Sequence, residues 1–552
     1  MTASLVLGPL LRHVGATTAS VWVETDAPAT VEVLGATAET FEVQSQHFAL
    51  VVVEGLEPSS VRPYEVRLDG ERVWPQEASG VPPSRIRTRP RTDEPGRLSA
   101  VFGSCRYPPT DDPELEAALG VDALDAYATR LMAELQALDA GDTEAAAAAL
   151  PDALFLLGDQ VYADETTPRT RRWLARRRDT STGAGEEIAS FGEYAHLYHE
   201  TWTDRELRWL LSTVPTAMIF DDHDVRDDWN TSQTWRRQME ALPWWRQRIR
   251  AGLASYWVYQ HIGNLDPEAL KADEIYGAVT AATGDVYEIL TAHADRADAE
   301  IGEPTGVRWS YRWDLGRTRL LMVDSRCGRV LNETDRLMIN SASFSWLEEN
   351  AHAGPDEHVD HLLIGSSIPW LMPPVIDHAE SMNEHSAAKG GRLGLAEKLR
   401  QAADFEHWPS FRASFDRLAR LVERVAASSS APATVCVLSG DVHHSYAARA
   451  RFPTPSTSRV YQLTCSPVRN SVPWFMEYVF AAAWRHGADR VSGWLARRWG
   501  IAPSPVSWAS IGGPYFGNAI ATLVVSGREA RIRIERSGTR GQLERSADLP
   551  LT

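Results

Sequence analysis

Six side chains that can bind metal ions follow apolar runs of this 552-residue chain, close to the point where each run ends. They are Cys105, Asp159, Tyr162, Asp222, Asp441 and His443. The three carboxylates favour hard cations such as Ca²⁺, Mg²⁺ or Mn²⁺, whereas the thiol, phenol and imidazole favour iron or zinc. Two unlike metal ions held by such a set would clamp a phosphoryl group and lower the pKa of a bound water. The set therefore predicts metal-assisted hydrolysis of phosphate esters.

Each of these residues taken alone has a simpler interpretation. An Asp after a strand is most often a helix cap or turn residue, and a Cys at the end of a buried strand is usually an inert core thiol. Unrelated structural roles would not require all six residues to be of metal-binding types. The combination therefore favours a metal site over six separate structural roles.

The spacing within two loops predicts how the ligands converge. A glycine precedes each Asp and permits a tight turn after the strand. We expect Tyr162 to lie one helical turn after Asp159 and to face the same way. We expect Asp441 and His443 to lie on one side of an extended segment, with His444 pointing away in a supporting or structural role.

Two further residues have predicted roles that involve the substrate directly. His223, next to the catalytic ligand Asp222, is placed to protonate the leaving alkoxide or to stabilise its charge. Arg326 would bind the substrate phosphate through its guanidinium group. An ion pair with Asp324 or another nearby carboxylate is an equally good interpretation of Arg326.

The elements around these residues predict the fold class α/β, with two domains. Residues 1–90 alternate apolar and polar side chains in short segments, which indicates an all-β sandwich of the immunoglobulin or fibronectin type III kind. Residues 97–552 alternate apolar runs with helical segments, which indicates a layered α/β domain with ligands at the carboxyl ends of its strands. Residues 87–95 are the expected linker. We expect residues 231–305 and 373–412 to be helical insertions around the site.

Composition limits the possible partners and location. The formal net charge of -18 argues against a general nucleic-acid-binding surface, and four cysteines in so long a chain do not indicate a disulfide framework. Residues 1–14 resemble neither a secretory nor a twin-arginine signal, and the late apolar stretch at 472–484 is too short to span a bilayer. We therefore expect a cytoplasmic protein, or an exported one from which a signal was removed, with no transmembrane segment.

Two arginine-rich stretches allow two interpretations each. Residues 171–178, after the Asp159 loop, would form a solvated helix face or a rim that steers anionic substrate. Residues 485–498, which include Trp494 and Leu495, would pack against the catalytic domain or lie on a membrane surface. The solvated face and the packed helix are the favoured interpretations.

Five motifs together resemble the PhoD-like alkaline phosphatase and phosphodiesterase family, a branch of the calcineurin-like metallophosphoesterases. They are Gly103-Ser104-Cys105, Gly158-Asp159-x-x-Tyr162, Asp221-Asp222-His223-Asp224, Asp324-Ser325-Arg326 and Gly440-Asp441-Val442-His443. The motifs stand in the family's order, and an N-terminal β-sandwich also resembles the family. The wider superfamily usually has a His at the position of Asp441, and this departure matches the PhoD-like branch.

The resemblance implies a ligand set for each of two metal ions. Fe³⁺ would be held by Cys105, Asp159, Tyr162 and His443. Ca²⁺ would be held by Asp159, Asp222 and Asp441. Mn²⁺, Mg²⁺ or Zn²⁺ are the alternative cofactors.

The expected substrate is a small-molecule or polymeric phosphate mono- or diester. One alternative is a metallohydrolase that acts on a non-phosphate ester. Another is a glycan- or lipid-binding protein with a vestigial metal site. The complete ligand set argues against the second alternative, because a decayed site would have lost some of its ligands.

Overall fold

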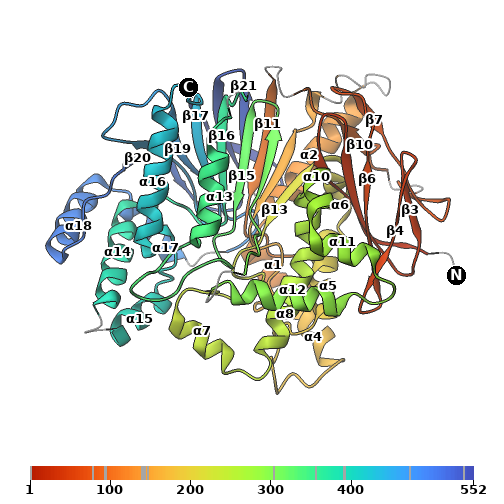
Figure 1. Cartoon of the computed structure of the whole chain (residues 1–552), viewed down its shortest axis with the longest axis horizontal. Helices are drawn as coiled ribbons and strands as arrows, with labels where there is room; N and C mark the ends of the chain where they lie inside the picture. Colours follow the sequence, from red (N-terminus) through yellow and green to blue (C-terminus); the bar gives the residue numbers. More distant parts are fainter. Residues whose placement is uncertain are drawn as a thin grey trace.

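The computed structural model describes residues 3–76, 80–91, 96–138, 145, 148–301, 305–354, 357–389, 393–471, 474–538 and 541–552. The N-terminal strands lie at the right of Figure 1, and helix α18 lies at the left edge. An all-β region followed by a mixed α/β region confirms the predicted fold class. The predicted linker includes residues 92–95, which lie outside the described residues.

Two four-stranded sheets form most of the N-terminal region, in the orders β1-β2-β6-β5 and β4-β3-β8-β9, with a β10-β7 pair beside them. The strands are β1 Leu5–Val14, β2 Ala19–Thr25, β3 Thr30–Val33, β4 Ala36–Glu39, β5 Phe41–Val43, β6 Gln46–Val53, β7 Val61–Pro63, β8 Val66–Leu68, β9 Glu71–Trp74 and β10 Arg85–Arg87. Val21 and Val51 of the first sheet and Val31 and Val66 of the second are fully buried in a shared core. This is the sandwich that the alternating pattern predicts.

The first of these sheets has a second buried face, which packs on the helical segment that contains Trp257 and Tyr259. Trp22 and Phe48 belong to the same core as both of those residues, and the rings of Trp22 and Tyr259 lie 5.3 Å apart. The fully buried Arg12 donates a hydrogen bond to the Gln260 carbonyl at 2.7 Å. The sandwich and the helical segment around residues 257–260 are therefore parts of one packed unit.

Two larger sheets form the centre of the molecule. The first has the order β13-β12-β11-β21-β22-β23 and the second the order β14-β15-β16-β17-β19-β18-β20. Their strands are β11 Arg97–Gly103, β12 Ala153–Leu157, β13 Thr216–Ile219, β14 Tyr311–Leu315, β15 Thr318–Val323, β16 His361–Ser366, β17 Thr434–Ser439, β18 Ser445–Arg451, β19 Arg459–Thr464, β20 Ser507–Tyr515, β21 Ala519–Ser526, β22 Glu529–Ser537 and β23 Leu543–Pro550. β11, β12 and β13 run parallel, as do β15, β16 and β17.

The helices that cover and extend these sheets lie between the strands in sequence. They are α1 Pro113–Leu119, α2 Ala123–Ala137, α4 Pro168–Ala175, α5 Phe191–Trp202, α6 Arg205–Thr213, α7 Gln233–Glu240, α8 Trp245–Tyr256, η1 Trp257–His261, α9 Ile262–Asn264, α10 Pro267–Ala272, α11 Glu274–Ala281, α12 Tyr287–Ala299, α13 Ser341–Ala351, α14 Pro374–Ala388, α15 Leu393–Ala402, η2 Trp408–Ser410, α16 Arg412–Ala427, α17 Trp474–Ala483 and α18 His486–Trp499. The two predicted insertions are helical where they are described. Every described helix is too short or too polar to cross a bilayer.

Burial of the second sheet on both faces explains its continuous apolar strands. Leu320 and Met322 of β15 lie in the core shared with the first sheet. Leu321 and Val323, the alternate residues, lie in a second core with residues of α13 and α16. Because the period of a strand is two residues, one apolar run fills both cores. The two sheets therefore lie face to face between layers of helices.

Candidate active site

The first predicted ligand, Cys105, lies just after β11. Its backbone φ is 57°, in the left-handed region, and its side chain is fully buried. Its Sγ lies 3.1 Å from the Ser104 Oγ and accepts a hydrogen bond from the Ser466 hydroxyl at 3.2 Å. Burial raises the pKa of the thiol well above its usual value, and the charges of Asp159 and Asp441 raise it further. A nearby cation would be needed to make the thiol a thiolate.

The loop after β12 carries Asp159 and Tyr162. Gly158 has a φ of 115°, and a Cβ there would lie 2.6 Å from the Asp221 Cβ, so the position requires glycine. The Asp159 Oδ1 is buried and has no hydrogen-bond partner among the described residues. The Tyr162 hydroxyl accepts a hydrogen bond from Asn470 Nδ2 at 3.1 Å. Burial raises the pKa of Tyr162 well above its usual value, and the charge of Asp159 raises it further.

The loop after β13 adds two adjacent carboxylates. One oxygen each of Asp159, Asp221 and Asp222 lies within 4.8 Å of the others, and all three side chains are buried. Burial raises the pKa of Asp159 and of Asp221 well above the usual value. Neighbouring carboxylates add to this effect, whereas His223 opposes it at Asp159 and Arg326 opposes it at Asp221. Carboxylates packed this closely repel unless protons or cations lie among them, so the arrangement fits a metal site.

His223 follows these carboxylates and is held by another one, Asp164. The His223 Nδ1 lies 2.9 Å from the Asp164 Oδ1, and the centroid of its ring lies 4.8 Å from that of Tyr162. Burial lowers the pKa of His223, but attraction to Asp164, Asp222 and Asp159 outweighs burial and raises the pKa well above its usual value. Because Nδ1 is engaged, Nε2 is the nitrogen that can give a proton to another group.

The loop after β17 carries Asp441 and His443. It touches the β11 loop, because a Cβ at Gly440 would lie 1.8 Å from the Ser104 Oγ. The Asp441 Oδ2 lies 2.9 Å from His407 Nε2. Burial favours a higher pKa for Asp441, but the hydrogen bond and charge of His407 bring it below its usual value. Burial lowers the pKa of His443, which favours the neutral imidazole that a metal ion requires.

Two predicted local geometries are wrong. The segment from Asp159 to Tyr162 contains no helical turn, and α4 begins only after it. The segment from Asp441 to His443 is not extended, because these two residues have φ values of 67° and 48° and the His443 N–H donates to the Asp441 carbonyl at 2.7 Å. Left-handed residues turn the chain in both loops, as the φ of 49° at Asp159 also shows.

Arg326 lies between the carboxylates of three elements. It is fully buried and pairs with Glu406, with Asp221 at 2.5 Å and with Asp222 at 3.3 Å. Asp222, Glu406 and Asp441 form a second group whose oxygens lie within 4.8 Å of one another. These contacts match the ion-pair interpretation of Arg326, and its contact with the substrate phosphate stays a prediction.

Several residues of the site had no predicted role, among them Asp221, Asp164, Glu406 and His407. Asp221 adjoins Asp222 in a recognised motif, and Asp164 lies two residues after Tyr162, so acidic residues that flank the motifs could have identified both. Glu406 and His407 lie between α15 and η2, in an insertion without a sequence motif. The His407 Nδ1 lies 2.8 Å from Glu380 Oε1 within this insertion, and its Nε2, 2.9 Å from Asp441 Oδ2, links the insertion to Asp441.

His444 and Arg329 serve the packing around the site. The His444 ring is fully buried and stacks on Phe480 at 4.3 Å, and its Nδ1 donates to the Val442 carbonyl at 2.7 Å. The fully buried Arg329 donates from Nε to the Ser325 carbonyl at 2.8 Å. Arg329 also pairs with Glu406 of the second carboxylate group at 3.4 Å.

A cavity of about 350 Å³ adjoins the site. Its lining includes Asp164, which holds His223, and Asn470, which contacts Tyr162. Arg171 of the first arginine-rich stretch also lines the cavity and pairs with Glu186 at 3.5 Å. The cavity therefore lies beside the residues that hold His223 and Tyr162.

Comparison with protein families identifies the family of this chain. A family model described as PhoD-like phosphatase matches residues 141–486, more than half of the chain. The chain belongs to the PhoD-like phosphatase family. Membership makes this PhoD-like phosphatase a phosphoesterase, and the match contains five of the six predicted ligands, with Cys105 preceding it. A second model, described as a domain of unknown function (DUF7800), matches residues 2–86.

Two solved structures share the fold of the PhoD-like phosphatase. A structure of PhoD is 12% identical, with a TM-score of 0.56, and the match covers 99% of this chain and 88% of that chain. A structure of purple acid phosphatase PPD1 from yellow lupin (Lupinus luteus) seeds is 11% identical, with a TM-score of 0.50 and coverage of 98% and 74%. These likenesses concern the fold alone. The comparison with curated proteins found no match.

Proposed function

We propose that this PhoD-like phosphatase hydrolyses phosphate mono- or diesters at a dinuclear site of the iron and calcium type. One observation carries the proposal. Buried oxygens of Asp159 and Asp221 have no hydrogen-bond partner in the described part of the chain, although oxygens from these two residues and Asp222 lie within 4.8 Å of one another. Buried polar atoms are normally satisfied, so a cation is the group that fits this place.

The donor types support two unlike sites. Cys105, Asp159, Tyr162 and His443 would hold Fe³⁺, because thiolate, phenolate and imidazole suit iron. Asp159, Asp222 and Asp441 would hold Ca²⁺, or Mn²⁺ or Mg²⁺, through oxygen atoms alone. When bound, the two ions would polarise a phosphoryl oxygen and lower the pKa of a water.

Residues around the ligands would orient them and move protons. The hydrogen bond from Asn470 to the Tyr162 oxygen favours the phenolate form. His407 holds the Asp441 carboxylate through a contact of 2.9 Å. His223, fixed by Asp164, would give its Nε2 proton to the leaving alkoxide. Arg326 offsets the negative charge of Asp221, Asp222 and Glu406.

Visible absorption combined with elemental analysis tests the iron site. A thiolate and a phenolate are charge-transfer donors to Fe³⁺, so the protein as isolated should absorb visible light. Cys105→Ala and Tyr162→Phe should each shift or bleach this absorption and reduce iron content while the circular dichroism spectrum stays unchanged. A colourless and fully active enzyme that contains only zinc or magnesium, and that tolerates Cys105→Ala, would remove the iron assignment.

A panel of substrates tests the reaction class. The purified protein should hydrolyse nitrophenyl phosphate, bis(nitrophenyl) phosphate or both. Nitrophenyl acetate, a carboxylic ester, is the matched substrate for the alternative function. Hydrolysis of the acetate alone would contradict the proposal.

A further inference from the structure

Two consecutive helices, α17 and α18, present apolar side chains outward. The residues are Phe475, Tyr478, Val479, Val491, Trp494, Leu495 and Trp499, and each is between 42% and 71% exposed. We call this set the α17–α18 surface. In each helix the exposed residues recur at intervals of three and four, which places them along one side of the helix. In a helix of a globular protein such a stripe normally faces the core.

The opposite sides of both helices fix them to the catalytic domain. The His378 Nδ1 of α14 lies 2.8 Å from the Ser492 Oγ of α18. Phe480 of α17 stacks on His444 at 4.3 Å. Helix α18 therefore packs on the domain as favoured from the sequence, but Trp494 and Leu495, which were expected to pack with it, are 50% and 42% exposed.

The charge around the α17–α18 surface is opposite to that of the whole protein. Residues 474–499 contain four arginines, Arg485, Arg490, Arg497 and Arg498, against Glu477 and Asp489, whereas the whole chain carries -18. No described residue forms an ion pair with any of these arginines, and the Arg498 guanidinium lies 5.0 Å from the centre of the Trp494 ring. A second copy of the chain would bring like charges together across this surface.

We propose that the α17–α18 surface docks the protein on an anionic lipid bilayer. Tryptophan, tyrosine and phenylalanine side chains partition into the interface between lipid headgroups and acyl chains, and arginines beside them attract anionic headgroups. Seven partly exposed apolar side chains and four arginines on neighbouring helices supply both contributions. Docking depends on neither the metal site nor the proposed reaction.

The position of this surface connects docking to catalysis. Helix α17 begins shortly after Asn470, which contacts Tyr162, and its Phe480 stacks on His444, the neighbour of the ligand His443. A bilayer that contacts the outer side of α17 would therefore lie close to the active site. Phosphate esters presented at that bilayer would meet the site without release into solution.

Vesicle co-sedimentation of the full-length protein tests the proposal. We expect binding to vesicles of phosphatidylcholine with phosphatidylglycerol, weaker binding at high salt, and little binding to phosphatidylcholine alone. Arg490→Gln combined with Arg498→Gln should weaken binding roughly 30-fold, because each basic residue near an anionic surface contributes about a factor of five. Val491→Ser combined with Trp494→Ser removes apolar area without adding charge and should abolish sedimentation with the vesicles.

Matched variants elsewhere on the surface provide the controls. Arg246→Gln with Lys271→Gln removes two charges whose side chains are each 72% exposed, and Leu34→Ser removes an exposed apolar group. These variants should bind vesicles like the wild type, and all variants should hydrolyse a water-soluble nitrophenyl ester at the wild-type rate. Equal binding to neutral and anionic vesicles, or unchanged binding of the Val491→Ser, Trp494→Ser protein, would overturn the proposal. A wild-type dimer in sedimentation velocity that these two substitutions dissociate would assign the surface to a second copy instead.

Discussion

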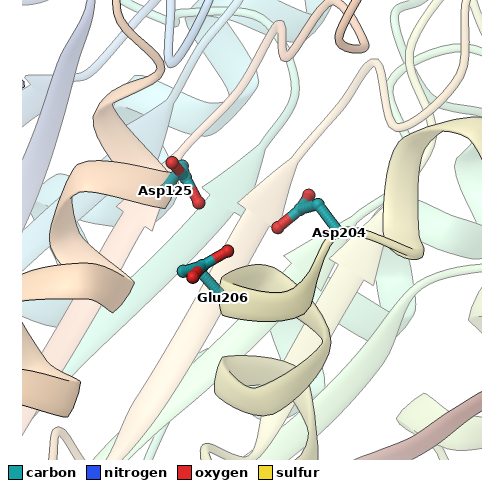
Figure 2. Close-up of side chains that lie close together, drawn as sticks. All are labelled: Asp125, Asp204 and Glu206. Atoms are coloured by element: carbon teal, nitrogen blue, oxygen red, sulfur yellow. The ribbon is translucent and has the colours of Figure 1, made fainter. Parts of the chain in front are cut away.

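In three places of the described chain, oxygens of three carboxylate residues lie within 4.8 Å of one another. Two of these groups differ in their surroundings: the strand-end group of Asp159, Asp221 and Asp222, and the helix group of Asp125, Asp204 and Glu206. In the strand-end group, Asp159 and Asp221 each have a buried oxygen that lacks a hydrogen-bond partner among the described residues. In the helix group, Asp125 of α2 and Asp204 and Glu206 at the start of α6 point toward one another and are only half-buried (Figure 2).

Two of the three carboxylates in the helix group have structural partners. The Asp204 carboxylate accepts a hydrogen bond from the Leu207 N–H at 2.8 Å, as a helix cap, and pairs with Arg106 at 3.1 Å. Glu206 pairs with Arg205 at 3.0 Å. Proximity of carboxylates therefore does not by itself identify a metal site. Unmet hydrogen-bonding capacity in a buried place is the better criterion.

The largest expected effect is the loss of activity when an Asp of the strand-end group is replaced by Asn, compared with the same replacement in the helix group. Asp159→Asn should remove metal ions and lower kcat/KM about 10³-fold or more, because a bound metal ion contributes several kcal/mol to the transition state. Asp125→Asn should leave metal content and kcat/KM unchanged. Elemental analysis and steady-state kinetics measure both. Equal losses in the two variants would end the distinction between the groups.

His223 tests whether a residue beside the strand-end group moves a proton. His223→Ala should lower kcat on the order of 10²–10⁴-fold for esters with alkyl leaving groups, with metal content unchanged. The loss should shrink for nitrophenyl esters, whose leaving group needs less protonation. Similar losses for both kinds of ester, or a loss of metal, would instead assign His223 a structural or ligand role.

His407 tests whether a residue that orients a candidate ligand also affects metal binding at the strand ends. His407→Ala should weaken binding of the labile cation about 10- to 100-fold, because the Asp441 carboxylate loses the group that orients it. Calcium titration of the chelated protein measures this affinity, and His407→Gln should restore part of it. The control is the exposed His352→Ala. Unchanged affinity in His407→Ala would contradict the orienting role.

The smallest effect concerns the stability contribution of Asp125. Burial, with the charges of Asp204 and Asp122, raises the pKa of Asp125 to about 6. The folded state therefore holds a proton that the unfolded state releases near pH 4, and stability falls as pH rises from about 4 to about 6. Asp125→Asn should be more stable than wild type above pH 6, by less than about 1 kcal/mol because solvent screens the group. Denaturation at pH 4 should show no difference, and a difference at pH 4 that vanishes at pH 8 would reverse the assignment.

Local patterns predicted the strands and the gathering of candidate ligands at their ends. Each strand that precedes a ligand is an apolar run, and burial on two faces leaves that pattern in the sequence itself. The contribution of Glu406 and His407 was not predictable, because α14 and α15 bring them to Asp441 through packing that no local pattern specifies.

The shapes of the ligand loops were not predictable either. Asp159 and Asp441 adopt left-handed conformations that are uncommon for residues with a Cβ, and contacts between loops, such as the one between Gly440 and Ser104, hold them there. The residue types of the candidate ligands were therefore readable from the sequence, whereas the backbone geometry that brings them together was not.

The shared core of the N-terminal sheet has a consequence for synthesis on the ribosome. Trp22 and Phe48 are translated early, but Trp257 and Tyr259, which cover them, follow roughly 200 residues later. At translation rates of about 5–20 residues per second, this aromatic face waits on the order of 10–40 s for its partner. We expect nascent chains halted before residue 257 to recruit chaperones that bind exposed apolar surface. Chains extended well beyond helix α12 should release these chaperones.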